Sequence, residues 1–261
     1  MYEILQHLEP AARVLDIGSR EGSFPDTATR AKVVRADLDR PAHPANFVQA
    51  NASALPFAAA SFDAIISNHS LEHFEKLDAA LNEWRRILKP NGQIYVAVPD
   101  SSTFSDRLYR WLARGGGHVN GFDSLHRLAA RLMKTTDLPV AAVRPLHSSL
   151  SFSNAKNRTV PAPRKLWLLL NGNETFLLAV TAILRAIDVL FKTRLTVYGW
   201  AIYLGEQREP IDETPWRNVC IRCGSAHPSD QLQSDGRVGG IPPFRHYKCP
   251  TCQTTNLFTN D

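Results

Sequence analysis

The chain has 261 residues, of which 44% are hydrophobic, so it can bury a substantial core and its composition excludes wholesale disorder. Its 30 basic and 25 acidic residues give a net charge of +5, a mild excess that does not by itself indicate a polyanion-binding protein. Residues 1–10 carry Glu3 and Glu9 and lack a continuous apolar run, so they do not resemble a signal sequence and we expect a cytoplasmic protein.

The first hundred residues predict alternating strands and helices. Short apolar runs typical of buried strands are Arg13–Ile17, Lys32–Asp37, Phe47–Ala50, Phe62–Ser67 and Gln93–Val98. Before the last of these, Leu77–Leu88 has apolar residues at helical spacing, and Pro90 to Gly92 end that helix. This alternation predicts an α/β fold: a doubly wound, mostly parallel, Rossmann-like sheet with helices on both faces.

The rest of the chain predicts an elaborated end to this fold. Asp123–Thr136 has the pattern of an amphipathic helix, and Val140–Ser151 and Val197–Gly205 have that of strands. We therefore expect one domain over residues 1–206, with a helical insertion at about 154–194. A linker rich in charge and proline, 207–216, would join it to a small module at 217–261.

A glycine-containing turn follows the first predicted strand. The strand ends near Asp16 and runs into Gly18, Ser19 and Gly22, where we expect a helix to begin. Such turns let the backbone approach a bound nucleotide closely, but they are common and weakly specific. About twenty residues on, the second strand ends in Asp37, whose carboxylate can accept both ribose hydroxyls of an adenosine.

Further segments follow in a fixed order, and together they carry a family resemblance. They are residues 51–57 (NASALPF), 61–67 (SFDAIIS), 71–73 (LEH) and 86–92 (RILKPNG). With the glycine turn and Asp37, this set resembles the class I S-adenosylmethionine (SAM)-dependent methyltransferases, in particular the type 11 group. The resemblance covers about residues 10–150 and the strand near residue 200, and it implies a SAM-dependent enzyme.

The resemblance also implies roles for individual residues. Asp16, Gly18, Ser19 and Gly22 would surround the methionine part of SAM, and Asp37 would hold the ribose. The remaining implied contacts are Leu38 on the adenine, Asn51 and Ala52 at the adenine edge, and Ser67, Asn68 and His69 near the methionyl end. Two positions depart from the family pattern: Arg20 stands where glycine is usual, and Asn51 where Asp is common.

The candidates for the chemistry are His69, His73 and His118, and we place His118 and His73 first. Methyl transfer needs an aligned nucleophile, and a general base helps when the acceptor is a hydroxyl. His118 lies in a polar and aromatic loop after the fifth strand, where loops of this architecture line the ligand crevice, so we prefer it as base or orienting group. His73 is the second candidate. Its structural alternative is a packing and hydrogen-bonding role at the start of the next helix.

Residues 175–191 (TFLLAVTAILRAIDVLF) form a strongly apolar stretch within the insertion. At 17 residues, with Arg185 and Asp188 inside it, the stretch is marginal as a membrane span. We expect a helix that covers the fold or an apolar substrate pocket. The alternatives are a dimer contact and a helix lying on a membrane surface. The basic residues that would flank such a surface helix are Arg164, Lys165, Lys192 and Arg194.

All four cysteines lie near the C-terminal end of the sequence. Two CxxC pairs, Cys220 with Cys223 and Cys249 with Cys252, have the spacing of a tetrahedral Zn(II) site, and the segment resembles a zinc ribbon. A closed four-thiolate site is structural, and the metal would stabilise a segment too small to fold alone. Disulfides or a redox pair are the alternatives.

The acceptor class follows least directly from these residues. We expect methylation, at oxygen, of a small-molecule, glycan or lipid-linked acceptor, with peripheral membrane contact as an option. An RNA methyltransferase that holds RNA with the cysteine module is the alternative enzyme. A non-catalytic adaptor with the same fold is the alternative from another class. Steep salt dependence of RNA binding would favour the RNA methyltransferase. Failure to bind SAM would favour the non-catalytic adaptor.

Overall fold

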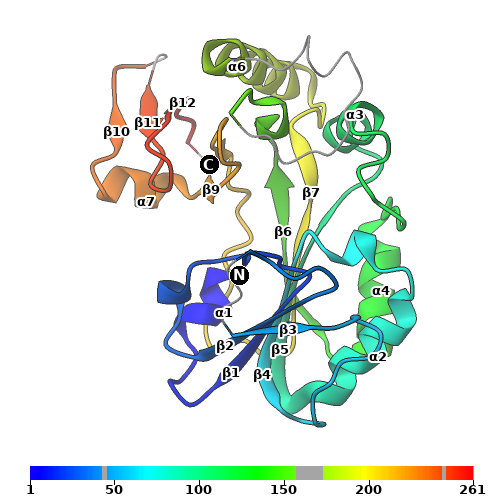
Figure 1. Ribbon diagram of the computed structural model, residues 1–261. Coiled ribbons are helices and arrows are strands. Elements are labelled where there is room, and N and C mark those ends of the chain that lie inside the picture. Colours follow the sequence, from blue (N-terminus) through cyan, green and yellow to red (C-terminus); the bar gives the residue numbers. More distant parts are fainter. Residues whose placement is uncertain (43–45, 157–172, 243–244, 261) are drawn as a thin grey trace. The chain divides into compact units, whose positions relative to one another are not determined.

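The computed structural model describes residues 1–42, 46–156, 173–242 and 245–260 (Figure 1). The chain forms two compact units, each built from three separate stretches. Unit 1 comprises Met1–Asp100, Val119–Arg144 and Trp200–Glu213; unit 2 comprises Ser101–His118, Pro145–Gly199 and Thr214–Asp261. Residues 157–172 of the predicted insertion, including Arg164 and Lys165, lie outside the described residues.

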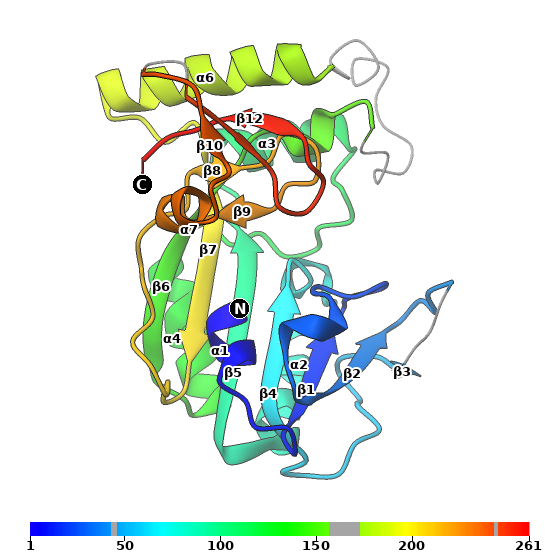
Figure 2. The ribbon, with the colours of Figure 1, turned by 90° about the vertical axis from the view of Figure 1, so that its left-hand side faces the viewer.

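A seven-stranded sheet confirms the predicted fold class. Its strands are β1 (Arg13–Ile17), β2 (Lys32–Asp37), β3 (Phe47–Gln49), β4 (Phe62–Asn68), β5 (Leu88–Pro99), β6 (Val140–His147) and β7 (Val197–Leu204). The strand order is β3-β2-β1-β4-β5-β7-β6, and β3, β2, β1, β4 and β5 pair in parallel. Figure 2 shows β7 running opposite to β4. Parallel central strands buried on both faces explain their continuous apolar runs.

Helices α2 (Leu77–Ile87) and α4 (Leu125–Thr136) cover one face of the sheet, and the short α1 (Tyr2–Gln6) lies on the other (Figure 1). Helix α2 forms because its apolar residues recur at helical spacing and face the core, where Trp84 is fully buried. Helix α4 begins after Ser124, whose side chain accepts a hydrogen bond from the Arg127 N–H, as an N-cap does.

The helix expected directly after the glycine turn is absent, which corrects one prediction. The described chain between β1 and β2 contains only a 3₁₀ turn, η1 (Asp26–Ala28). Glycine and serine have low helix propensity, and Pro25 at the N-cap of η1 cannot donate a backbone hydrogen bond. Farther along, Pro90 to Gly92 do not precede β5 but lie within it, at an irregularity between the pairs Phe62–Leu88 and Ala64–Gln93.

Unit 2 contains two longer helices and the cysteine segment. Helix α3 (Phe104–Leu112), which the sequence pattern did not predict, begins after the N-cap Thr103, and α6 (Glu174–Phe191) begins after the N-cap Asn173. The cysteine segment consists of β8 (Asn218–Val219), β9 (Ala226–His227), α7 (Ser229–Ser234), β10 (Val238–Gly239), β11 (His246–Lys248) and β12 (Thr255–Leu257). Among the described residues, no helix has the length and apolarity needed to cross a membrane.

Candidate cofactor site and cysteine cluster

The turn after β1 is held by a close approach of Gly18 to the turn after β4. Gly18 has φ of +67°, and its N–H donates to the Ala36 carbonyl at 2.7 Å. A Cβ at this position would stand 2.4 Å from the Cβ of Ser70. Ser70 in turn donates from Oγ to the Ile17 carbonyl at 2.9 Å. Only glycine fits here, because it alone combines this φ with no side chain.

Asp16 places a buried carboxylate at the end of β1. Its Oδ2 accepts a hydrogen bond from the Ser23 N–H at 2.8 Å and lies 3.9 Å from Nε of Arg35. Its Oδ1 is buried without a hydrogen-bond partner in the described chain. Burial raises the pKa of this carboxyl, while Ser23 and Arg35 oppose that shift. An oxygen of this kind fits a ligand that donates hydrogen bonds or carries positive charge.

Asp37 ends β2, the strand paired with β1. Its Oδ2 accepts from the Arg20 N–H at 2.9 Å, so the carboxylate also holds the glycine turn. Arg20 has φ of +46°, the left-handed region that glycine adopts freely, and its side chain is exposed. Arg20, which stands where the family usually has glycine, therefore adopts a backbone conformation typical of glycine, at a modest conformational cost. Leu38, next to Asp37, is 61% exposed and presents an apolar side chain at this edge.

The other sequence-predicted contacts have mixed surroundings. Asn51 is exposed, and its Oδ1 accepts from the N–H and Oγ of Ser53 at 2.9 and 2.8 Å. Ala52 is buried in the core. Ser67 is fully buried, and its Oγ lies 2.8 Å from Oγ of Ser70. Ser67 therefore helps to hold the turn after β4 against the turn after β1, which Ser70 contacts.

After Ser67, Asn68 and His69 are half-buried at the end of β4. Burial lowers the pKa of His69 to about 4, with a smaller effect of the nearby His73, so the ring is neutral at physiological pH. A neutral ring does not repel a cationic ligand. The strand ends thus bring Asp16, Asp37 and the β4 turn to one edge of the sheet, as parallel topology requires.

Arg35 is a residue that the motif pattern did not single out. It is buried in β2, and its Nη2 donates to the Phe24 carbonyl at 3.2 Å and pairs with Asp26 Oδ1 at 2.5 Å. Gly22, with φ of +112°, lies so close that a Cβ there would be 2.6 Å from Nε of Arg35. An arginine within the apolar run of β2 was the only signal in the sequence.

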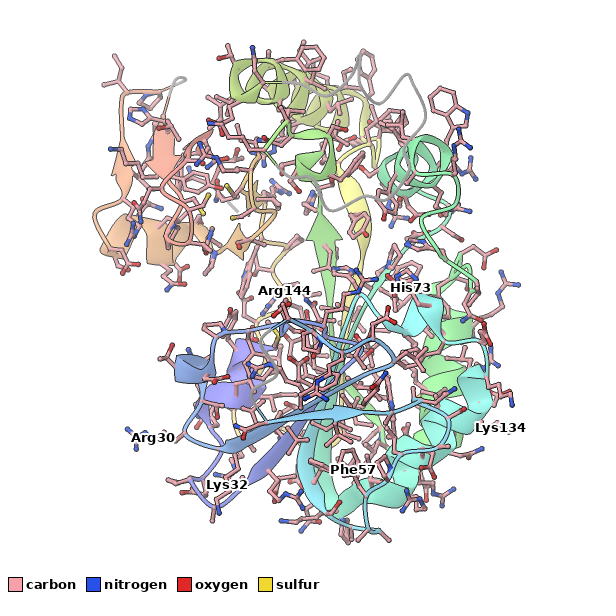
Figure 3. The ribbon with its side chains drawn as sticks, in the orientation of Figure 1. Arg30, Lys32, Phe57, His73, Lys134 and Arg144 are labelled. Atoms are coloured by element: carbon pink, nitrogen blue, oxygen red, sulfur yellow. The ribbon has the colours of Figure 1, made fainter. Side chains whose placement is uncertain are left out.

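The two candidate catalytic histidines differ in their surroundings. His73 ends the 3₁₀ turn η2 (Leu71–His73) in unit 1, with its side chain exposed (Figure 3). His118 belongs to unit 2, where its side chain is 7% exposed and its Nδ1 lies 3.7 Å from Oδ1 of Asp106. The ring also contacts Tyr109, with 5.5 Å between ring centroids. A carboxylate beside a buried imidazole can orient the ring.

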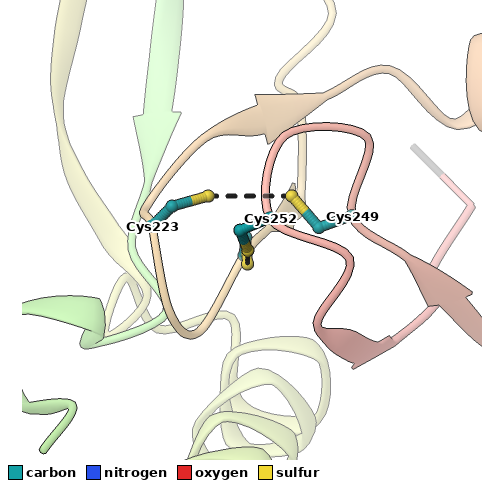
Figure 4. A group of neighbouring side chains, drawn as sticks. Cys223, Cys249 and Cys252 are labelled. Carbon is teal, nitrogen blue, oxygen red and sulfur yellow. Dashed lines mark hydrogen bonds between the residues drawn. The ribbon is translucent and has the colours of Figure 1, made fainter. Parts of the chain in front are cut away.

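The four cysteine sulfurs gather in one cluster and all lie within 4.8 Å of one another. Figure 4 shows Cys223, Cys249 and Cys252 of this cluster. Sγ of Cys220 is 3.5 Å from Sγ of Cys252, and Sγ of Cys223 is 3.6 Å from Sγ of Cys249. Four thiolates around a tetrahedral Zn(II), each at about 2.3 Å from the metal, stand about 3.8 Å apart. The sulfurs are too far apart for disulfide bonds, so the donor set fits zinc.

The cluster is anchored to other parts of unit 2. The backbone of the first CxxC accepts two buried hydrogen bonds, from Ser149 Oγ to the Cys220 carbonyl at 2.8 Å and from Asn154 Nδ2 to the Ile221 carbonyl at 2.9 Å. Ile221 packs in an apolar cluster with Leu177 of α6. The cysteine segment and the apolar helix are therefore parts of one compact unit. The division of the chain into a domain, a linker and a separate module stays a prediction.

Comparison with known proteins identifies the fold and the enzyme class. Residues 15–96 match the family model described as a methyltransferase domain. The chain is 28% identical over 190 residues to a malonyl-[acyl-carrier protein] O-methyltransferase of Methylococcus capsulatus, covering 62% of this chain and 69% of that protein. It is 39% identical over 85 residues to a ubiquinone/menaquinone biosynthesis C-methyltransferase UbiE of Rhizobium meliloti, covering 33% of this chain and 30% of that protein.

A solved structure agrees at the level of the fold. A SAM-dependent methyltransferase from Archaeoglobus fulgidus superposes with a TM-score of 0.50 at 17% identity, covering 75% of this chain and 86% of that one. The match over residues 15–96 and these relatives identify a methyltransferase domain in this chain, and the strand order and glycine turn have the arrangement of the class I SAM-dependent methyltransferase fold.

Proposed function

We propose that this enzyme transfers the methyl group of SAM to an oxygen atom of a small-molecule, glycan or lipid-linked acceptor. The observation that carries the cofactor site is the pair of carboxylates, Asp16 and Asp37, at the ends of the adjacent strands β1 and β2. Transfer to oxygen is supported by the name of one relative, a malonyl-[acyl-carrier protein] O-methyltransferase. A small-molecule acceptor is supported by the name of another, a C-methyltransferase of ubiquinone/menaquinone biosynthesis.

The residues of the glycine turn would hold the cofactor. Oδ1 of Asp16 is buried and has no hydrogen-bond partner among the residues that the structure describes. It is therefore suited to the amino group of the methionine part, with Gly18, Ser19 and Gly22 leaving room for it. Asp37 would accept hydrogen bonds from the ribose and Leu38 would cover the adenine, with Asn51 and Ala52 at its edge. Ser67, Asn68 and His69 would line the methionyl end.

SAM supplies an activated methyl group on a sulfonium, so the chain mainly has to align the acceptor and exclude water. Where the acceptor is a hydroxyl, His118 is our candidate for removing its proton. Asp106, 3.7 Å from Nδ1, would stabilise the imidazolium that results. His73 is the second candidate for this role.

We also propose that Cys220, Cys223, Cys249 and Cys252 hold a structural Zn(II). The sulfur separations of 3.5 and 3.6 Å support this assignment. A site closed by four thiolates offers no open position for a substrate, so the metal would stabilise unit 2 and take no part in methyl transfer.

Calorimetric titration of the purified, zinc-loaded chain with SAM and with its demethylated product tests the cofactor site. We expect micromolar binding that Asp37→Ala weakens at least about tenfold, because two charge-assisted hydrogen bonds are lost. The matched control is Asp39→Ala, which removes an exposed carboxylate two residues away. Activity on carboxyl and hydroxyl acceptors is then measured by the demethylated product formed.

The alternatives give different results in the same experiments. Folded protein that binds no SAM would refute the cofactor site and favour the adaptor. Binding of SAM together with RNA binding that falls steeply with salt would favour the RNA methyltransferase.

A further inference from the structure

Helix α6 directs its polar side chains toward the rest of unit 2. Glu174 accepts from Nε of Arg222 at 2.5 Å, and Arg185 donates to the Arg217 carbonyl and to Oγ1 of Thr259. Asp188 accepts from the N–H of Leu195 at 2.6 Å and of Thr196 at 2.8 Å. All three charged residues of the helix are therefore used by contacts within the unit.

The exposed residues of α6, which the structure describes in full, include none with a charge. Five are large and apolar: Phe176 is 46% exposed, Ile183 59%, Val189 74%, Leu190 74% and Phe191 71%. In Figure 2, α3 and β12 lie on one side of α6. A surface helix normally buries one apolar face and exposes its charges. Helix α6 does bury Leu177 within unit 2, but it also exposes this second apolar face and keeps its charges in contacts within the unit. The expected cover of the fold or of a substrate pocket does not account for these side chains.

Two features favour a lipid surface as the partner of this face. The exposed cations Lys192 and Arg194 directly follow the stripe, where they would reach lipid phosphates. The exposed residues of the helix offer almost no hydrogen-bonding group, with Thr175 as the exception, whereas protein interfaces carry about one hydrogen bond per 100–200 Å². The hydrocarbon region of a bilayer requires no hydrogen bonds from the side chains that enter it.

We propose that α6 docks in the plane of an anionic phospholipid bilayer, with its apolar stripe at the boundary between headgroups and acyl chains. At 18 residues the helix is about 27 Å long, which suits this orientation, and it lacks the apolarity to cross the bilayer. Docking would hold the enzyme where a lipid-linked acceptor resides, and this consequence alone rests on the proposed function.

Sedimentation of the full-length, zinc-loaded chain with vesicles tests the proposal. We use vesicles of phosphatidylcholine alone and vesicles in which a quarter of the lipid is phosphatidylserine. Leu190→Glu combined with Phe191→Glu should lower partitioning at least about a hundredfold, since burial of two large apolar side chains is lost. The control is Ile241→Glu, which changes an apolar residue outside α6 that is 77% exposed and should leave partitioning unchanged.

A second pair of variants tests the electrostatic part. Lys192→Gln with Arg194→Gln should weaken binding to the anionic vesicles about thirtyfold and leave the weak binding to neutral ones unchanged. Folded protein that sediments with neither vesicle overturns the proposal. A second outcome also overturns it: the wild-type chain does not bind vesicles but forms a dimer, and Leu190→Glu with Phe191→Glu dissociates that dimer. This result would assign the exposed face of α6 to a second copy of the chain. Titration of each preparation with SAM shows whether the cofactor site is intact, so failure of docking and failure of the proposed activity are told apart.

Discussion

Substitution of Gly18 tests whether the cofactor turn depends on its close approach to Ser70. Gly18→Ala places an L side chain at φ of +67°, which costs about 1–2 kcal/mol. The added methyl would stand 2.4 Å from the Cβ of Ser70. Relief of such an overpacked contact typically costs about 1–3 kcal/mol more. The sum of about 2–5 kcal/mol is a large part of the stability of a typical domain, about 5–15 kcal/mol.

The two contributions can be separated. Gly236 has almost the same backbone conformation, with φ of +64°, but no heavy atom lies within 4 Å of a Cβ built there. Gly236→Ala should therefore cost only about 1–2 kcal/mol. In the double variant with Ser70→Gly, the clash at Gly18→Ala disappears, so the cycle of single and double variants should show a coupling of about 1–3 kcal/mol.

The assay is urea unfolding followed by circular dichroism, with a SAM titration of each variant that remains folded. We expect Gly18→Ala to weaken SAM binding as well, because the turn must move to relieve the contact. If Gly18→Ala and Gly236→Ala lower the free energy of unfolding equally, or if Gly18→Ala shows no coupling with Ser70→Gly, the close approach to Ser70 is not what requires glycine at position 18.

Three further predictions concern metal, pH and the end of α6. Cys223→Ser should abolish stoichiometric zinc, measured by mass spectrometry of dialysed protein, and full retention would refute a four-thiolate site. His69→Asn should flatten the pH dependence of the free energy of unfolding. Burial lowers the pKa of His69 to about 4, below the ordinary 6.5, so the unfolded chain binds more protons than the folded one. Wild-type stability therefore falls as the pH falls from about 6.5 to about 4. Urea unfolding at about pH 7 and about pH 5 compares the two proteins, and identical slopes would contradict this. Asp188→Ala should destabilise the turn after α6 by about 2–4 kcal/mol, because the four hydrogen bonds that this carboxylate accepts from Thr193, Leu195 and Thr196 are lost. Hydrogen exchange at the Leu195 and Thr196 amides should rise, while Asp188→Asn should retain partial protection.

Much of the fold could be predicted because its signals are local. The apolar runs of β1, β2 and β4 each span only a few consecutive residues, and the observed bounds agree with the predicted ones within one residue. The turn after β1 was also visible, because glycine at a positive φ is a property of single positions. The prediction of a helix directly after this turn was wrong, because the weak helix propensity of residues 18–31 outweighed the general strand-helix pattern of the fold.

The surroundings of the candidate site residues depend on partners far apart in the chain. Arg35 contacts the loop after the glycine turn from β2, and Asp106 of α3 lies beside His118. Such contacts have no signature at a fixed spacing, so motif patterns point to His118 and not to the carboxylate beside it. The roles of these residues toward SAM and an acceptor stay predictions.

By itself, the sequence determined the central strands with α2 and α4, the glycine turn with its two carboxylates, and the paired cysteines. These features are encoded by periodicity and spacing within short stretches. Only the tertiary structure decided that the four sulfurs converge, that Ser70 excludes a side chain at Gly18, and that α6 exposes a second apolar face. A helical stripe can be read from the sequence, but the side on which it is buried depends on where the polar partners of Arg185 lie, and those residues are brought beside it only by folding.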